Sequence, residues 1–77
     1  MNRLPRLNGR QVLQALRHGG FDLSHVRGSH HYLRRHDGTG LVVVPVHGNR
    51  TLPAGTLNSV LRQAGLTIEE LNRLWRE

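Results

Sequence analysis

The sequence predicts a small α+β domain in which one helix precedes three strands and two further helices follow them. Two segments carry apolar residues at helical spacing, and a β-branched run and shorter alternating runs lie between them. Glycine-containing turns separate these segments. A chain of 77 residues is long enough for one domain, so we expect residues 1–77 to form a single antiparallel sheet packed under helices.

The first helix is expected to begin after Asn8. Asn8 is a favourable N-cap residue, and Gln11 follows it at the spacing of a capping box. The pair Gly19-Gly20 then ends the helix. Between these signals lies a one-sided apolar stripe, which consists of Val12, Leu13, Ala15 and Leu16.

Three strands are expected between residues 21 and 44. The first begins at Phe21, and the second covers His30 to Arg35. The pair Asp37-Gly38 predicts a tight turn into the third strand. This third strand, Leu41 to Val44, is almost entirely β-branched. We therefore expect it to be buried on both faces or to lie in the middle of the sheet.

Two helices are expected after the strands. Pro53 suits the first turn of a helix, and Gly65 suits its end. The residues between them form one apolar face, made of Leu57, Val60, Leu61 and Ala64. Thr67 and Glu70 form a second capping box, which opens a short C-terminal helix.

The chain is strongly basic and contains no cysteine. Its 11 basic residues are all arginine, 5 residues are acidic, and the formal net charge is +6. This charge favours polyanionic partners, namely RNA, DNA or an acidic protein. The absence of disulfides and thiolates is compatible with a reducing cytoplasm. The longest apolar run, Leu41 to Val46, is far shorter than the roughly 20 residues of a membrane span. We therefore expect a cytoplasmic protein with no membrane partner.

Two adjacent histidines, His30 and His31, follow the pair Gly28-Ser29 at the start of the second strand. Neighbouring residues on a strand face opposite sides of the sheet. His31 shares its side with Leu33, which marks the inward face, so we expect His31 to pack and His30 to be open to substrate. On this parity alone, His30 is either a proton-transfer group or an ordinary exposed histidine.

Several blocks of the sequence form a recognisable series. They are Gly20-Phe21, Gly28-Ser29-His30-His31, Val44-Pro45-Val46-His47, Leu52 to Leu57 and Ala64 to Thr67. In order and spacing they resemble the HicA (YcfA-like) family of toxins from toxin-antitoxin pairs, over a region from about Gly9 to Leu74. The resemblance implies a fold like the double-stranded-RNA-binding domain and an endoribonuclease that acts as an mRNA interferase.

The same resemblance implies roles for particular residues and for a partner. The catalytic histidine of the Gly-Ser-His motif would be His30. A HicB-type antitoxin would neutralise the toxin by covering the His30 surface. Many members carry an arginine five residues before that histidine, where this chain has His25, so a basic group there is expected from Arg27 instead.

Cleavage of RNA through its own 2′-hydroxyl needs a base, an acid and positive charge around the phosphorus atom. Imidazole suits the proton steps because it titrates close to neutral pH. Arginines would hold phosphates, and a glycine and a serine in a turn would offer backbone and hydroxyl contacts. The candidate RNA-binding residues are Arg27, Gly28, Ser29, Arg34, Arg35 and His47. No histidine pair has helical i, i+4 spacing, so neither a metal site nor a cofactor is expected.

Two other functions fit parts of the sequence. A non-catalytic RNA-binding module would use the same sheet and charge, because recognition of RNA by shape and 2′-hydroxyl contacts needs no acid or base. A DNA-binding regulator is less compatible with the sequence, because strands and loops separate the two main helices where a helix-turn-helix needs a tight turn.

Overall fold

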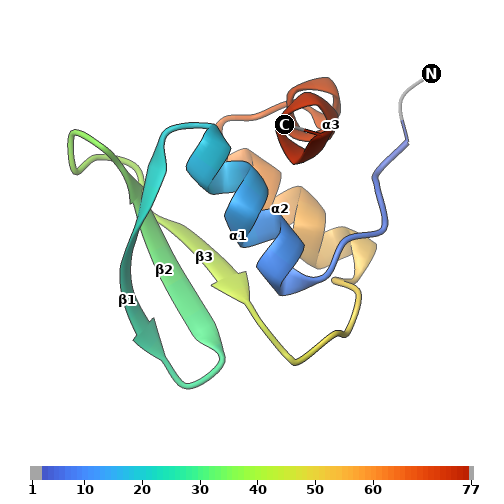
Figure 1. Cartoon of the computed structure of the whole chain (residues 1–77), viewed down its shortest axis with the longest axis horizontal. Coiled ribbons are helices and arrows are strands. Elements are labelled where there is room, and N and C mark those ends of the chain that lie inside the picture. The colour runs from blue at the N-terminus through green and yellow to red at the C-terminus, as the bar shows by residue number, and fades with distance from the viewer. Residues whose placement is uncertain (1–2, 77) are drawn as a thin grey trace.

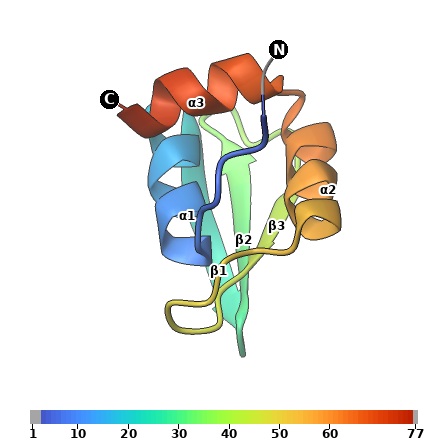
Figure 2. The same ribbon diagram turned by 90° about the vertical axis from the view of Figure 1, so that its right-hand side faces the viewer.

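Helices cover one face of a three-stranded sheet and leave the other face open (Figures 1 and 2). The computed structural model describes residues 3–76. The elements follow the order α1 (Gly9–His18), β1 (Phe21–Arg27), β2 (His30–Arg35), β3 (Val42–Pro45), α2 (Ala54–Ala64) and α3 (Ile68–Arg76). The predicted α+β class and the order of its elements are confirmed.

The sheet is an antiparallel meander with β2 in the middle and β1 and β3 at its edges. The expectation that the valine run lies in the middle of the sheet or is buried on both faces is wrong. Val42 and Val44 are buried under the helices, whereas Val43 on the opposite face is only half-buried. The outer edge of β3 is covered by α2, because the Val43 N–H donates to the Gln63 side-chain oxygen at 2.8 Å. Because α2 covers this strand and Gln63 bonds to its outer edge, a β-branched run can occupy an edge position in the sheet.

A β-bulge interrupts β1. Leu23 is opposite Leu33, and His25 is opposite Tyr32, so Ser24 is the extra residue of β1 at this point. Beyond the bulge the pairing continues to Arg27, which lies opposite His30. The odd-numbered residues of β1 therefore face the helices before the bulge and the open side of the sheet after it.

The core lies between the inner face of the sheet and the three helices. Leu33 on the central strand is fully buried, as are Leu16 of α1, Leu57 of α2 and Leu71 of α3. Apolar burial of this kind supplies the main favourable term in folding. The residues on the helix-facing side of β2 are His31, Leu33 and Arg35, so the parity predicted from the sequence is confirmed for this strand.

Local signals set the helix ends as predicted. Asn8 and Gln11 form both hydrogen bonds of the capping box at α1. Gly65 ends α2 with a φ of 70°, a conformation that glycine adopts without strain. Thr67 and Glu70 form the capping box of α3. The Leu74 carbonyl accepts a hydrogen bond from His18 Nδ1 at 3.0 Å, which ties α3 to the end of α1.

Gly9 allows the start of α1 to touch the end of β3. A Cβ atom at this position would lie 2.5 Å from the Pro45 carbonyl oxygen and 2.8 Å from a Val46 methyl group. Both distances are far below van der Waals contact, and one of the two atoms belongs to the backbone. Glycine is therefore required for the observed position of α1 on the sheet.

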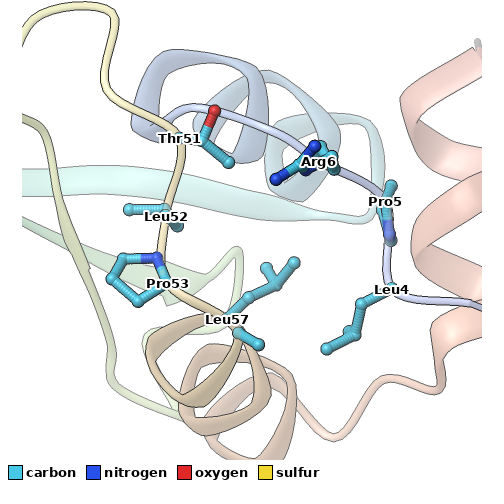
Figure 3. A pocket seen from close by; sticks show the side chains of 8 residues that line it. Leu4, Pro5, Arg6, Thr51, Leu52, Pro53 and Leu57 are labelled. Carbon is cyan, nitrogen blue, oxygen red and sulfur yellow. The ribbon is translucent and has the colours of Figure 1, made fainter.

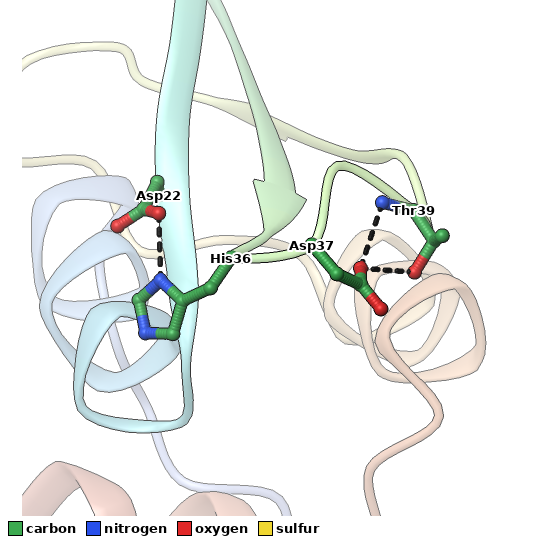
Figure 4. Close-up of polar contacts among 4 residues, drawn as sticks. All are labelled: Asp22, His36, Asp37 and Thr39. Carbon is green, nitrogen blue, oxygen red and sulfur yellow. Dashed lines mark hydrogen bonds and ion pairs between the residues drawn. The ribbon is translucent and has the colours of Figure 1, made fainter.

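The turn between β2 and β3 holds two polar contacts at the end of the sheet (Figure 4). His36 Nδ1 lies 2.6 Å from an Asp22 oxygen, in a side-chain contact that is largely exposed. Asp37 accepts hydrogen bonds from the Thr39 hydroxyl at 2.6 Å and the Thr39 N–H at 2.9 Å. The hydrogen bond from the Thr39 hydroxyl, and to a smaller extent the one from the Thr39 N–H, lowers the pKa of Asp37 below the ordinary value.

We expect Gly9→Ala to lower the free energy of unfolding. Overpacking costs about 1–3 kcal/mol, and the helical preference of alanine offsets at most about 1 kcal/mol. Gly55→Ala in α2 is the matched control, because a Cβ there meets no atom within 4 Å. Urea unfolding measures both variants, and a Gly9→Ala protein as stable as the Gly55→Ala protein would contradict the close contact.

The turn between β2 and β3, which contains Asp37 and Thr39, should be less stable at acidic pH. A pKa lowered by folding means that the ionised form stabilises the native state, so this contribution is present above the unfolded-state pKa and is lost as the pH falls through the folded-state pKa. An NMR titration should find the Asp37 pKa below that of an unperturbed aspartate. Thr39→Val, which removes the hydroxyl, should raise it, and an unchanged titration in this variant would show that the hydroxyl bond has no effect.

Candidate functional site

The tip of the β1–β2 hairpin presents the Gly-Ser-His motif. Gly28 and Ser29 are the two turn residues between Arg27 and His30, which are paired across the strands. Gly28 has a φ of 58°, and a Cβ atom added at this position would have no atom within 4 Å. A glycine with positive φ at the first turn position is typical of a type II′ hairpin turn. The Val46 N–H donates to the Ser29 carbonyl at 2.8 Å, so the chain after β3 holds the turn in place.

His30 lies on the outer face of the sheet, away from the helices. It is exposed, and its strand partners are Arg27 on β1 and Pro45 on β3. Tyr32 and Arg34 follow on the same face of β2. Arg27, His30 and Arg34, which were predicted to act together, therefore share an open surface.

His31 lies on the inner face, where a groove runs between β1–β2 and α1. The groove has a volume of about 430 Å³. Its lining residues are Arg10, Leu13, Gln14 and Arg17 of α1, with Leu23 and His31 of the sheet. His31 is half-buried but is not packed in the apolar core. It therefore borders a concave surface that carries two guanidinium groups.

The His31 ring has a defined hydrogen-bond contact. Its Nδ1 lies 3.4 Å from the Ser29 carbonyl oxygen, a long contact in which only a protonated nitrogen can donate. In the neutral ring this leaves Nε2 with its lone pair, which is the form that a general base needs. Within residues 3–76, no hydrogen bond of this kind is found for the His30 ring.

Two of the predicted RNA-binding residues lie apart from this region. Arg35 stands at the other end of β2, where it donates to the Ala64 carbonyl at 2.9 Å and its guanidinium lies 5.1 Å from the centre of the Phe21 ring. Arg35 thus connects the sheet to α2. His47 follows β3 and lines a separate hollow of about 240 Å³ with Arg50 and Thr56.

A further hollow lies between the N-terminal segment and the start of α2 (Figure 3). Its volume is about 400 Å³, and its walls include Leu4, Pro5, Leu52 and Leu57. Arg6 is the ionisable side chain at its margin. Proton transfer needs a titratable group within hydrogen-bond reach of the substrate, so the groove at His31 is better equipped for acid-base chemistry than this hollow.

Metal-ligating side chains do not gather in the described part of the chain. Among residues 3–76, no group of three or more histidine, aspartate or glutamate side chains has the arrangement needed to hold a metal ion. The helices in this part of the structure are also too short and too polar to cross a bilayer.

Comparison with protein-family models identifies the chain. Residues 9–66 match the family described as the HicA toxin of bacterial toxin-antitoxin systems. The chain belongs to the HicA toxin family. Comparison with individually curated proteins gave no significant match. The matched region extends from the start of α1 through α2, and it contains both faces of the hairpin described above.

Membership of the HicA family makes the protein a toxin with an antitoxin partner. The groove beside His31 also contains residues that the sequence interpretation overlooked, namely Arg10, Gln14 and Arg17. These residues recur at positions i, i+4 and i+7 of α1, so they lie on one side of the helix. This polar stripe is visible in the sequence, but its position beside His31 depends on how α1 crosses the sheet.

Proposed function

We propose that this HicA-family protein is an endoribonuclease that cleaves mRNA without a metal ion, as the toxin of a type II toxin-antitoxin system. The observation that carries the proposal is the groove in which His31 lies with Arg10 and Arg17. A concave site with a titratable group and fixed positive charge is suited to a reaction at a phosphodiester. Family membership supports the toxin role.

The reaction requires movement of two protons. A base removes the proton of the ribose 2′-hydroxyl, whose oxygen then attacks phosphorus, and an acid gives a proton to the 5′-oxygen that leaves. The strand is cut, and the phosphate remains as a 2′,3′-cyclic ester. A guanidinium group stabilises the negative charge that develops on the phosphate oxygens. Arg10 and Arg17, which line the same groove as His31, would supply this charge.

His30 and His31 are treated as alternative proton-transfer groups, because they point to opposite faces of β2. The sequence favours His30, which is open to solvent beside Arg27. The geometry favours His31, since its groove supplies two cationic side chains and its Nδ1 faces a carbonyl. We therefore propose His31 as the first candidate and His30 as the second.

A non-catalytic RNA-binding module is the competing function. The open sheet face with Arg27, His30 and Arg34 supports it, because such a surface could hold RNA without proton transfer. Binding and cleavage therefore need to be measured separately.

Variants of the two histidines distinguish these possibilities in excess EDTA. The wild-type protein should cut a labelled single-stranded RNA, and His31→Ala should reduce the cleavage rate by about 10²–10⁴-fold, the usual contribution of a general acid or base. RNA affinity should remain close to that of the wild type. His36→Ala, at the opposite end of β2, is the control for loss of an exposed histidine.

The other results have definite meanings. If His30→Ala is the inactive variant and His31→Ala cuts normally, the reaction takes place on the outer face. If the wild type binds RNA but does not cut it under any of these conditions, the RNA-binding module replaces the nuclease. If cutting stops in EDTA and returns with a divalent cation, the metal-independent mechanism is wrong.

A HicB-type antitoxin would neutralise the toxin by covering the hairpin tip, including His30. The formal charge of +6 would attract an acidic antitoxin over a long range. The association rate should therefore fall as the salt concentration rises, while the dissociation rate changes less. Stopped-flow measurements of the two purified proteins test this, and an association rate that is independent of salt would show that long-range charge does not steer the complex.

A further inference from the structure

Two aromatic rings are stacked on the open face of the sheet. His25 of β1 and Tyr32 of β2 are paired across the strands, and their ring centres are 4.4 Å apart with an angle of 5° between the planes. His25 is exposed and Tyr32 is half-buried. The helices all lie on the other side of the sheet (Figure 2). The pair is therefore accessible to a ligand.

The bulge at Ser24 places His25 in this pair. Leu23 faces the helices opposite Leu33, and regular alternation would return His25 to that same inner face. The extra residue instead brings His25 to the outer face opposite Tyr32. Ser24 Oγ lies 3.1 Å from His25 Nδ1, a contact that restrains the imidazole ring. A local irregularity of β1 thus builds the stacked pair.

Positive charge lies on both sides of the rings along the strands. Arg27 stands towards the hairpin tip, and Arg34 stands two residues beyond Tyr32, roughly 7 Å along the strand. The acidic residue of this face is Asp22, whose carboxylate is bound by His36 at 2.6 Å. The outer face therefore carries two stacked rings, with an arginine a few residues away along the strands on either side of them.

We propose that the His25–Tyr32 pair is a platform on which an unpaired base of an RNA strand stacks, while Arg27 and Arg34 hold the flanking phosphates. Every base has a π face, and aromatic platforms inside basic surfaces bind single strands by stacking with little sequence preference. The site rests on the proposed function and adds to it, because it selects single-stranded RNA on the face opposite the groove of His31. His25 and Tyr32 position the substrate and take no part in proton transfer.

The experiment measures affinity for RNA that the enzyme cannot cut. The probes are a labelled 2′-O-methyl oligouridylate, the same strand with abasic sites in place of the bases, and a duplex of equal length. Fluorescence anisotropy at one fixed salt concentration gives Kd for the wild type and for Tyr32→Leu, Tyr32→Phe and His25→Ala. Asn58→Ala, which changes an exposed residue of α2 away from this face, is the control, and thermal unfolding verifies that each variant is folded.

Tyr32→Leu should weaken binding of the oligouridylate by roughly 5- to 150-fold, since one stacked base contributes about 1–3 kcal/mol. Tyr32→Phe should retain affinity, and His25→Ala should lose part of it. The effect of Tyr32→Leu should vanish with the abasic strand and with the duplex, because neither offers an unpaired base. A role of Tyr32 in folding alone would not produce this dependence on the bases.

Three results would overturn the platform. The first is equal affinity of Tyr32→Leu and wild type for the oligouridylate. The second is an equal loss with the abasic strand, which would assign the effect to charge or shape. The third is a Tyr32→Leu protein that keeps RNA affinity but no longer binds the antitoxin, which would make the rings a protein contact. If the wild type binds none of the probes, the proposed RNA function itself fails together with the platform.

Discussion

The contact between the start of α1 and the end of β3 is the constraint on which the position of the candidate site depends. Gly9 lets the helix approach the Pro45 carbonyl more closely than any side chain would permit. From this fixed point α1 crosses the inner face of the sheet, and its polar stripe comes to lie opposite His31. The next residue after Pro45, Val46, also bonds to Ser29 in the hairpin turn. One close contact therefore positions both walls of the groove.

One-sided helix cover divides the hairpin into two chemically different surfaces. The inner surface is concave, and there His31 lines a groove together with two arginines of α1. The outer surface is open and carries His30 among Arg27, Tyr32 and Arg34. Consecutive residues of β2 thus contribute to separate environments, and a small domain gains two faces that an RNA strand could contact without a large enclosed pocket.

The elements of this fold could be predicted from local chemistry, but the site could be predicted only in part. The capping residues Asn8 and Gln11, and the αL glycine Gly65, act within a few residues of their own helix, so their pattern is sufficient. The opposite orientations of His30 and His31 follow from strand geometry. These features need no knowledge of how distant segments pack.

The errors and omissions have a common physical cause in tertiary packing. The valine run of β3 has the composition of a central strand, yet it lies at an edge because α2 and Gln63 cover it. The polar stripe of α1 lines a groove only because the sheet lies opposite it. The stripe consists of Arg10, Gln14 and Arg17. The bulge at Ser24, which turns His25 to the outer face, was not predicted because no glycine, proline or other turn residue marks it in the sequence. Each depends on a partner that is distant in the sequence.

The two edges of the sheet also bear on how copies of the protein behave towards one another. A straight, bare edge strand is a template on which another chain can add by backbone pairing, which leads to aggregation. At β3 the Gln63 side chain already occupies the Val43 amide. At β1 the extra residue at Ser24 breaks the regular ladder of donors and acceptors. The irregularity that aims an aromatic ring outwards thus also protects the chain from self-templated polymerisation.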